Sequence, residues 1–205
     1  GLRSLLRQDP NIIMVGEIRD NETAALAINA ALTGHLVLST LHTSSAAGAL
    51  PRLLDMKIEP FLIASTVSAI ISQRLVRRVI GDQQDPYTLN EAEIARMKKS
   101  VNLDRIAKLL EREKVVAPGT SLDKLEWTRA KPSQEAPDGY RGRLGIHEVL
   151  VMSETIKQLV IQNATSDQIE ERAREEGMIT MLEEGFIRAA QKITTIEEIM
   201  RVTNE

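Results

Sequence analysis

Two short aliphatic runs near the start of the sequence limit most strongly what this chain can fold into. They are Ile12–Val15 and Leu36–Leu38, and polar or turn-forming residues bound each of them. Unbroken aliphatic runs of this length are typical of strands that are buried on both faces of a parallel sheet. Between the runs, Asp20 or Asn21 can cap an alanine-rich helix that ends at Gly34. The order strand, helix, strand therefore predicts an α/β fold with a parallel sheet.

Further helices and one more strand are expected beyond these runs. Residues 46–54 are small and apolar enough to pack as a helix, and Pro60 stands where it can open a helix that continues to about Ile71. Residues 73–79 alternate between basic and apolar side chains, which predicts a strand. We therefore expect residues 1–80 to form part of an α/β domain.

The sequence changes character after residue 80. Residues 81–139 combine many charges with several prolines and with amphipathic patterns over 91–100 and 103–113, which predicts a charged helical insert. Residues 140–205 are expected to form a mostly helical C-terminal subdomain. The insert would be held by aliphatic packing, for example among Ile94, Met97, Ile106, Leu109 and Leu110. The later helices have possible caps at Ser153, at Thr165 or Ser166, and at Thr194 or Thr195.

Composition narrows the classes of function. The 205 residues include one Trp, two Tyr and two Phe, and they carry a formal net charge of -3. Nucleic-acid binders usually need a basic excess, and those that bind single strands also use stacking rings. We therefore expect no nucleic-acid partner, which disfavours a nucleic-acid translocase. Cysteine is absent, which excludes disulfides, thiolate metal sites and a cysteine nucleophile.

The sequence also bears on location and completeness. No apolar stretch is long enough to span a bilayer, and no signal peptide is visible. We therefore expect a cytoplasmic protein with no direct membrane insertion. The sequence begins at Gly1 without Met, in what reads as a helix already under way, and it is expected to be a fragment of a longer protein.

Reactive side chains follow both predicted strands. Glu17 follows the first run, where a carboxylate can hold Mg²⁺ through water beside nucleotide phosphates. His42 follows the second run, where an imidazole can reach a γ-phosphate. Because ligands of parallel α/β sheets bind beyond the carboxyl ends of the strands, this edge is the expected site. The residues alone leave a structural role open for both, since acids and histidines are also common at strand ends.

Other polar residues have simpler explanations. His35 and His42 lie seven residues apart on one predicted strand, so they would point to opposite faces about 20 Å apart and could not share a metal ion. His147 has no second ligand near it in the sequence. Arg19 and Asp20 could form a surface ion pair or belong to a helix cap.

Four segments occur in an order that a known family shares. They are RQDPNIIMVGEIRDNETAALAINAALTGHLVLSTLHTSSAAGALPRLLDM, EPFLIAS, QRLVRR and GYRGRLGIHEVL. Over about residues 1–80 and 139–205 the chain resembles the type II secretion and type IV pilus assembly ATPases. The resemblance implies a partial RecA-like parallel sheet flanked by helices, followed by the helical C-terminal subdomain. It also implies a hexameric ATPase that uses ATP and Mg²⁺ and powers the assembly of pilins or pseudopilins.

The resemblance implies roles for the residues at the strand ends. VGEIRD is similar to the family's Walker B element, so Glu17 would hold the water shell of Mg²⁺ and Arg19 would link this element to a neighbouring subunit. TGHLVLSTLHT is similar to the family's histidine box, so His42 would sense the γ-phosphate. The same box contains the nucleotide-binding candidates His35, Thr40 and Thr43.

Two features depart from the family. No G-x-x-x-x-G-K-[ST] string occurs, and the aspartate box with the general-base glutamate is also absent, so we expect this chain alone to be inactive. Many members bind zinc through two Cys-x-x-Cys pairs, whereas here residues 79–83 and 136–138 occupy those places, so no zinc is expected.

The implied setting is a secretion or pilus machine. The implied partners are further copies of the protein and an inner-membrane platform protein, through which the protein would attach peripherally to the inner membrane. The alternative is a non-catalytic, degenerate or regulatory subunit of the same machinery. The sequence leaves open whether the machine performs pilus extension, competence or type II secretion.

Overall fold

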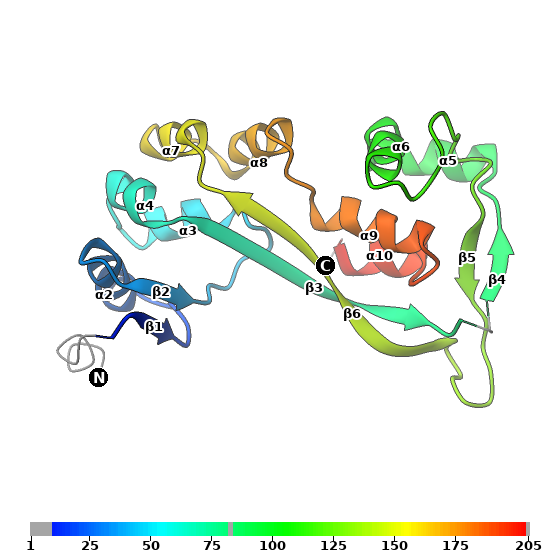
Figure 1. The fold of residues 1–205 in the computed structure, drawn as a ribbon, viewed down its shortest axis with the longest axis horizontal. Coiled ribbons are helices and arrows are strands. Elements are labelled where there is room, and N and C mark those ends of the chain that lie inside the picture. The colour runs from blue at the N-terminus through cyan, green and yellow to red at the C-terminus, as the bar shows by residue number, and fades with distance from the viewer. Residues whose placement is uncertain (1–9, 82–83, 204–205) are drawn as a thin grey trace. The chain divides into compact units, whose positions relative to one another are not determined.

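The structure, a computed structural model, describes residues 10–81 and 84–203. It is a mixed α/β fold (Figure 1), and its contacts divide it into two compact units. Unit 1 contains the described residues up to Ser72 together with Glu148–Met178, and unit 2 contains Gln73–His147 together with the described residues from Ile179 onwards. Each unit is therefore built from two separate stretches of chain. None of the helices in the described ranges has the length and apolar character that a bilayer span requires.

Unit 1 begins with the predicted strand, helix and strand. Its elements from this part of the chain are β1 (Ile12–Val15), α2 (Asn21–Leu32), β2 (Leu36–Ser39), α3 (Ala49–Asp55) and α4 (Pro60–Thr66). β1 and β2 pair in parallel, with Ile12 opposite Leu36 and Val15 opposite Ser39. The predicted parallel pair is confirmed, so both strands end at the same edge of the sheet.

Local residues fix both ends of α2. Asp20 has an extended backbone, and its side chain accepts a hydrogen bond from the Thr23 N–H at 2.8 Å. Gly34 follows the helix with a φ of 92°, a conformation that glycine adopts without steric cost. Buried alanines such as Ala24 and Ala30 allow the helix to lie close to its neighbours. The predicted helix between the strands is confirmed, and of its two possible caps the structure selects Asp20.

One face of the β1–β2 pair is left uncovered by the described residues. Side chains alternate between the two faces of a strand. Ile13 is buried, whereas Ile12, Met14, Leu36 and Leu38 are exposed. The expectation that both faces are buried is therefore wrong for the described part of the chain. In these residues α2 contacts β2, but the face that carries the four exposed side chains has no cover.

The core of unit 1 is aliphatic, as composition requires. It combines α3 and α4 with α7 (Glu154–Ile161), α8 (Ser166–Glu175) and the end of β6 (Tyr140–Val151). Its fully buried side chains include Leu50, Ile63, Leu150 and Ile156. Because α4 packs against both α2 and α7, the late part of the chain completes the unit that the first strands begin.

The helix expected from Pro60 to about Ile71 is shorter than predicted. α4 ends at Thr66, and Val67 already has an extended backbone with a ψ of 125°. β3 (Ala69–Val79) begins before the predicted strand and pairs with β6. Thr66, Val67 and the isoleucines that follow are β-branched, and such side chains fit a strand better than a helix. Strand pairing therefore prevails over helical spacing here.

Unit 2 contains the charged segment and the end of the described chain. Besides much of β3 and β6, its elements are β4 (Gln84–Tyr87), α5 (Glu91–Met97), α6 (Leu103–Arg112), β5 (Trp127–Ala130), α9 (Met181–Ala190) and α10 (Ile196–Thr203). The two helices predicted within the charged segment are present as α5 and α6. β4 and β5 pair antiparallel, which the sequence does not predict. The segment expected to be helical is therefore mixed.

The aliphatic packing predicted for this segment is confirmed. Ile106, Leu109 and Leu110 are buried, and Ile94 and Met97 are partly buried. Two rings complete the core of unit 2, since Trp127 and Phe186 are both fully buried and meet edge to face with centroids 6.2 Å apart. Trp127 is the only tryptophan of the chain.

Side-chain caps begin the later helices. The predicted caps Ser153, Thr165 and Thr195 are confirmed, because each accepts a hydrogen bond from a backbone N–H three residues on. Thr180 caps α9 in the same way and forms a capping box with Glu183, which the sequence analysis missed.

A buried carboxylate ties α10 to β3 inside unit 2. Glu198 accepts hydrogen bonds from the Arg77 backbone N–H at 3.0 Å and guanidinium at 2.6 Å, and from the Arg201 guanidinium at 2.9 and 3.0 Å. The Arg77 guanidinium also lies 4.2 Å from the centroid of the Tyr140 ring. Burial alone would raise the pKa of Glu198, but the hydrogen bonds from Arg201 and Arg77 lower it to about 2.

Candidate functional site

The parallel pairing brings the segments beyond β1 and β2 together in unit 1. The Ile18 N–H donates to the Thr40 carbonyl at 2.8 Å, and the Thr40 hydroxyl donates to the Gly16 carbonyl at 2.7 Å. These two bonds continue the contact between the two segments beyond the last paired residues, Val15 and Ser39. The side chains that follow each strand are therefore held at one edge of the sheet.

Glu17, Arg19 and His42 form a cluster at this edge. Glu17 Oε2 lies 2.7 Å from Arg19 Nε and 3.1 Å from His42 Nε2. The side chains of Arg19 and His42 are 70% and 82% exposed, and that of Glu17 is 36% exposed. The structure thus brings together the acid and the histidine that the sequence placed at neighbouring strand ends. It adds Arg19 as the second partner of Glu17.

The electrostatics of the cluster favour an ionised Glu17. The hydrogen bond from Arg19 lowers the pKa of Glu17 most, the hydrogen bond from His42 lowers it further, and partial burial opposes both. A carboxylate can only accept hydrogen bonds, so the bond to His42 requires the proton to be on Nε2. In the neutral imidazole, Nδ1 then remains an acceptor.

The other predicted residues occupy different places. His35 lies at the opposite end of β2, and its Nδ1 is 3.0 Å from both the Ala30 carbonyl and the Thr33 hydroxyl at the end of α2. The structure therefore does not bring His35 into the cluster. Thr43 lies beside the cluster in sequence, and its hydroxyl donates to the Ser45 carbonyl at 2.9 Å. The hydroxyls of Thr40 and Thr43 thus hold backbone in the described structure.

One buried acid near the cluster is missed by sequence reasoning. Glu148 on β6 is 4% exposed, and its Oε1 accepts a hydrogen bond from the Ala46 N–H at 2.6 Å. Ala46 lies four residues after His42, in the turn that leads to α3. Its position directly before the apolar run Val149–Met152 is the signal that could have drawn attention to it.

The donor set at the strand ends suits a hydrated Mg²⁺ ion better than a tightly held metal. No group of three or more His, Asp or Glu side chains that could hold a metal ion is found in residues 10–81 and 84–203. Mg²⁺ usually keeps several waters and binds through one or two carboxylates plus substrate phosphates. A partly exposed, ionised Glu17 fits that requirement, because it can accept hydrogen bonds from metal-bound water.

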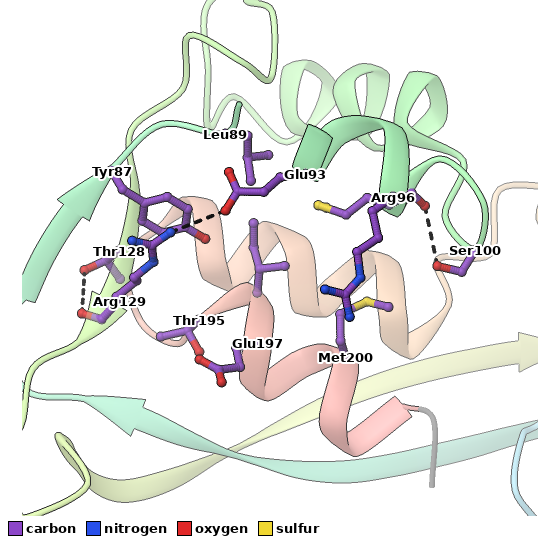
Figure 2. A pocket seen from close by; sticks show the side chains of 12 residues that line it. Tyr87, Leu89, Glu93, Arg96, Ser100, Thr128, Arg129, Thr195, Glu197 and Met200 are labelled. Carbon is purple, nitrogen blue, oxygen red and sulfur yellow. Dashed lines mark hydrogen bonds and ion pairs between the residues drawn. The ribbon is translucent and has the colours of Figure 1, made fainter. Parts of the chain in front are cut away.

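Unit 2 contains a separate cavity of about 450 Å³ (Figure 2). Its apolar lining is Leu89, Met97, Ile196 and Met200, and its charged lining is Glu93, Arg96, Arg129 and Glu197. Arg129 is already engaged, since its guanidinium lies 4.0 Å from the Tyr87 ring centroid and 3.4 Å from Glu93. Two arginines and two glutamates balance each other, so the lining has no excess charge that would select an anion or a cation.

Comparison with known proteins places these features in a family. Residues 1–201 match the family described as Type II/IV secretion system protein. The chain belongs to this family. The VGEIRD and TGHLVLSTLHT segments that carry the Glu17 cluster lie within the matched residues.

The curated relatives are secretion and pilus-assembly proteins. The chain is 44% identical to type II secretion system protein E of Xanthomonas campestris, 43% identical to type IV pilus assembly ATPase PilB of Thermus thermophilus, and 42% identical to type II secretion system ATPase E of Vibrio cholerae. Each alignment covers 100% of this chain. It covers 33%, 21% and 37% of those proteins, respectively, so the chain spans about a third of their length or less.

Solved structures of lower identity share the fold. The Legionella pneumophila ATPase DotB matches with a TM-score of 0.59 and 22% identity, over 98% of this chain and 40% of that one. The pilus retraction motor PilT, solved with bound ADP, matches with a TM-score of 0.61 and 24% identity, over 98% of this chain and 41% of that one. The predicted RecA-like α/β fold is therefore confirmed.

Proposed function

We propose that this chain is part of a hexameric ATPase that powers the assembly of pilins or pseudopilins in type IV pilus biogenesis or type II secretion. The observation that carries the proposal is the cluster of Glu17, Arg19 and His42 at the carboxyl edge of a parallel strand pair. Ligands bind at this edge in α/β sheets. Membership of a family whose curated members include secretion and pilus-assembly ATPases supports the same conclusion.

In the proposed reaction ATP is the substrate, and Mg²⁺, when bound, would neutralise charge on its phosphates. Glu17 would accept hydrogen bonds from water around the ion, because its lowered pKa favours the ionised carboxylate at neutral pH. His42 holds its Nε2 proton toward Glu17 and is exposed enough to turn toward a γ-phosphate. Arg19 Nε lies 2.7 Å from Glu17 Oε2. Its exposed guanidinium would also link this element to a neighbouring subunit.

Other parts of the proposed site belong outside these residues. No G-x-x-x-x-G-K-[ST] string occurs among the 205 residues, so the phosphate-binding loop would lie in another part of the protein. We propose that ATP hydrolysis therefore needs that part as well as this chain. The proposed partners are further copies of the protein and an inner-membrane platform protein, engaged from the cytoplasmic side.

The test is ATP turnover by the full-length product of the gene that encodes this chain. Glu17→Gln removes the charge but keeps the shape, and we expect it to lower kcat by about 100-fold or more, the scale seen when one key electrostatic group is lost. Glu22→Gln is the matched control, because Glu22 is an exposed acid on the neighbouring helix.

Two results would count against the proposal. Equal turnover by wild type and Glu17→Gln would remove Glu17 from the site. Full-length wild type that binds nucleotide without turning it over would favour the alternative, a regulatory subunit of the same machinery.

A further inference from the structure

The position of His42 depends on the irregular segment that follows it. Residues 40–48 connect β2 to α3 without forming a strand or an α-helix, and residues 43–48 are the part that follows His42. Within the segment, the Thr43 hydroxyl donates to the Ser45 carbonyl at 2.9 Å, and the Ser45 hydroxyl accepts from the Gly48 N–H at 3.1 Å. These bonds are local, so they fix the shape of the turn but not its place in unit 1.

Glu148 supplies a long-range anchor for this turn. Its Oε1 accepts a hydrogen bond from the Ala46 N–H at 2.6 Å, across 102 residues of sequence. Ala46 is fully buried and Glu148 is nearly so, which removes both from competition with water. Breaking the bond would leave a buried polar group without this partner, and such groups are costly to leave unpaired. The turn is therefore held firmly at this point.

The place of Glu148 on its strand shows that the side chain is not there for packing alone. In the part of β6 that belongs to unit 1, Glu148 and Leu150 are buried, and Met152, directly after the strand, continues this buried row. The residues between them, Val149 and Val151, are exposed. A core-facing position in such a row normally carries an aliphatic side chain. Glu148 occupies it with a carboxyl group directed at the Ala46 amide.

We propose that Glu148 is a positioning residue of the ATP site, a role that rests on the proposed function. By holding the Ala46 amide, it fixes the turn after β2 and thereby keeps His42 at the 3.1 Å contact with Glu17. Glu148 touches neither nucleotide nor metal in this scheme. It acts through four residues of backbone, from Ala46 back to His42.

The test compares three substitutions of Glu148 in the full-length product. Glu148→Ala removes the acceptor, and we expect kcat for ATP to fall about tenfold or more with a smaller change in KM, because a misplaced catalytic group slows the reaction itself. Glu148→Gln keeps an oxygen at the same reach and should retain most of kcat. Glu148→Asp keeps the carboxyl group but shortens the side chain, and it should be slower than Glu148→Gln.

The order of kcat among the three Glu148 variants separates a positioning role from other roles. The comparison of Glu148→Gln with Glu148→Asp remains informative if Glu148→Ala does not fold. A role that required only negative charge would make Glu148→Asp faster than Glu148→Gln, which would overturn the proposal. Ile156→Val is the control for general destabilisation, since Ile156 is fully buried in the same core. It should lower the melting temperature while leaving kcat of the folded protein unchanged. An equal loss of kcat in Ile156→Val and Glu148→Ala would also overturn the proposal.

A second measurement does not depend on ATP turnover. Hydrogen exchange of the full-length product should show faster exchange over residues 43–48 in Glu148→Asp than in Glu148→Gln, with Ala46 as the reporting amide. Equal exchange rates over residues 43–48 in Glu148→Asp and Glu148→Gln would show that Glu148 does not hold the turn. If the wild type lacked turnover while the exchange difference persisted, the proposed function would fail and the anchoring of the turn would stand.

Discussion

Two carboxylates in this molecule have similar partners and opposite surroundings. In unit 1, Glu17 accepts from Arg19 and His42 at a partly exposed strand end. In unit 2, Glu198 accepts from Arg77 and Arg201, and its side chain is 0% exposed. Both groups have a lowered pKa, although only that of Glu198 falls to about 2. Pairing with cations therefore does not by itself distinguish a site from a structural contact.

The difference lies in what the pairing leaves available. Both oxygens of Glu198 are used, since Arg77 and Arg201 each donate twice. In the described part of the chain, the bonds to Glu17 all involve Oε2, and its partners are mostly in solvent. A ligand can reach Glu17 without breaking the fold. Glu198 can be reached only by unfolding part of unit 2.

Removing the buried carboxylate should have the largest effect on stability. Glu198→Ala removes a buried carboxylate that accepts four hydrogen bonds, although Arg77 keeps its ion pair with Asp138. We expect it to lower the free energy of unfolding of unit 2 by about 3 kcal/mol, the size that the lowered pKa of Glu198 implies. Urea unfolding of the 205-residue chain followed by Trp127 fluorescence measures this, because the only tryptophan of these 205 residues is buried in unit 2. Glu197→Ala is the control, since Glu197 is the exposed neighbour on the same helix. Equal effects of the two variants would contradict the assignment.

Acid should weaken unit 2 through the same group. The pKa of Glu198 is about 2 in the folded protein against 4.5 ordinarily, so its contribution is complete above pH 4.5 and is lost as the pH falls toward 2. A shift of this size corresponds to about 3 kcal/mol of unfolding free energy. Unfolding curves from Trp127 fluorescence, measured from about pH 6 down to about pH 2, cover the range between these two pKa values and should show this decline. A decline of the same steepness in Glu198→Gln would argue against Glu198 as its source.

A smaller effect is expected from the hydroxyl of Tyr140. Its oxygen lies 2.8 Å from the Thr195 hydroxyl, while its ring stacks under the Arg77 guanidinium. Tyr140→Phe keeps the stacking and removes the hydrogen bond, which should cost about 0.5–1.5 kcal/mol in urea unfolding. Tyr87→Phe is the matched control, because Tyr87 also stacks with an arginine, Arg129. The prediction fails if Tyr87→Phe costs as much.

The exposed carboxylate should contribute least to stability. Surface ion pairs add little because solvent screens them. Glu17→Gln should therefore leave the thermal midpoint unchanged in far-UV circular dichroism, the suitable probe for a unit without tryptophan. The contrast with Glu198→Ala would be lost if Glu17→Gln lowered the midpoint clearly. That result would make Glu17 a structural residue.

Local patterns predict the first strands and the site edge well. The runs that form β1 and β2 and the cap at Asp20 are short-range features, and parallel pairing then requires Glu17 and His42 to lie at one edge. The sequence left open whether Arg19 and Asp20 form a surface ion pair or belong to a helix cap. The structure shows that Asp20 caps α2 while Arg19 bonds to Glu17.

Contacts between distant residues escape such patterns. Ala46 and Glu148 are 102 residues apart, and Arg77 and Glu198 are 121 residues apart, so no periodicity connects them. β4 and β5 are also difficult to predict, because each has four residues and Pro86 interrupts the first. In each case, tertiary packing decides what the local sequence leaves open.

The division of each unit into two stretches of chain has a consequence for how such proteins can diverge. The chain passes from one unit to the other after Ser72, after His147 and after Met178. Any single recombination crossover between two related genes within this region therefore gives at least one unit of mixed parentage. A crossover between Ala46 and Glu148 would take these two partners from different ancestors, so such hybrids survive only where both parents supply compatible halves of unit 1.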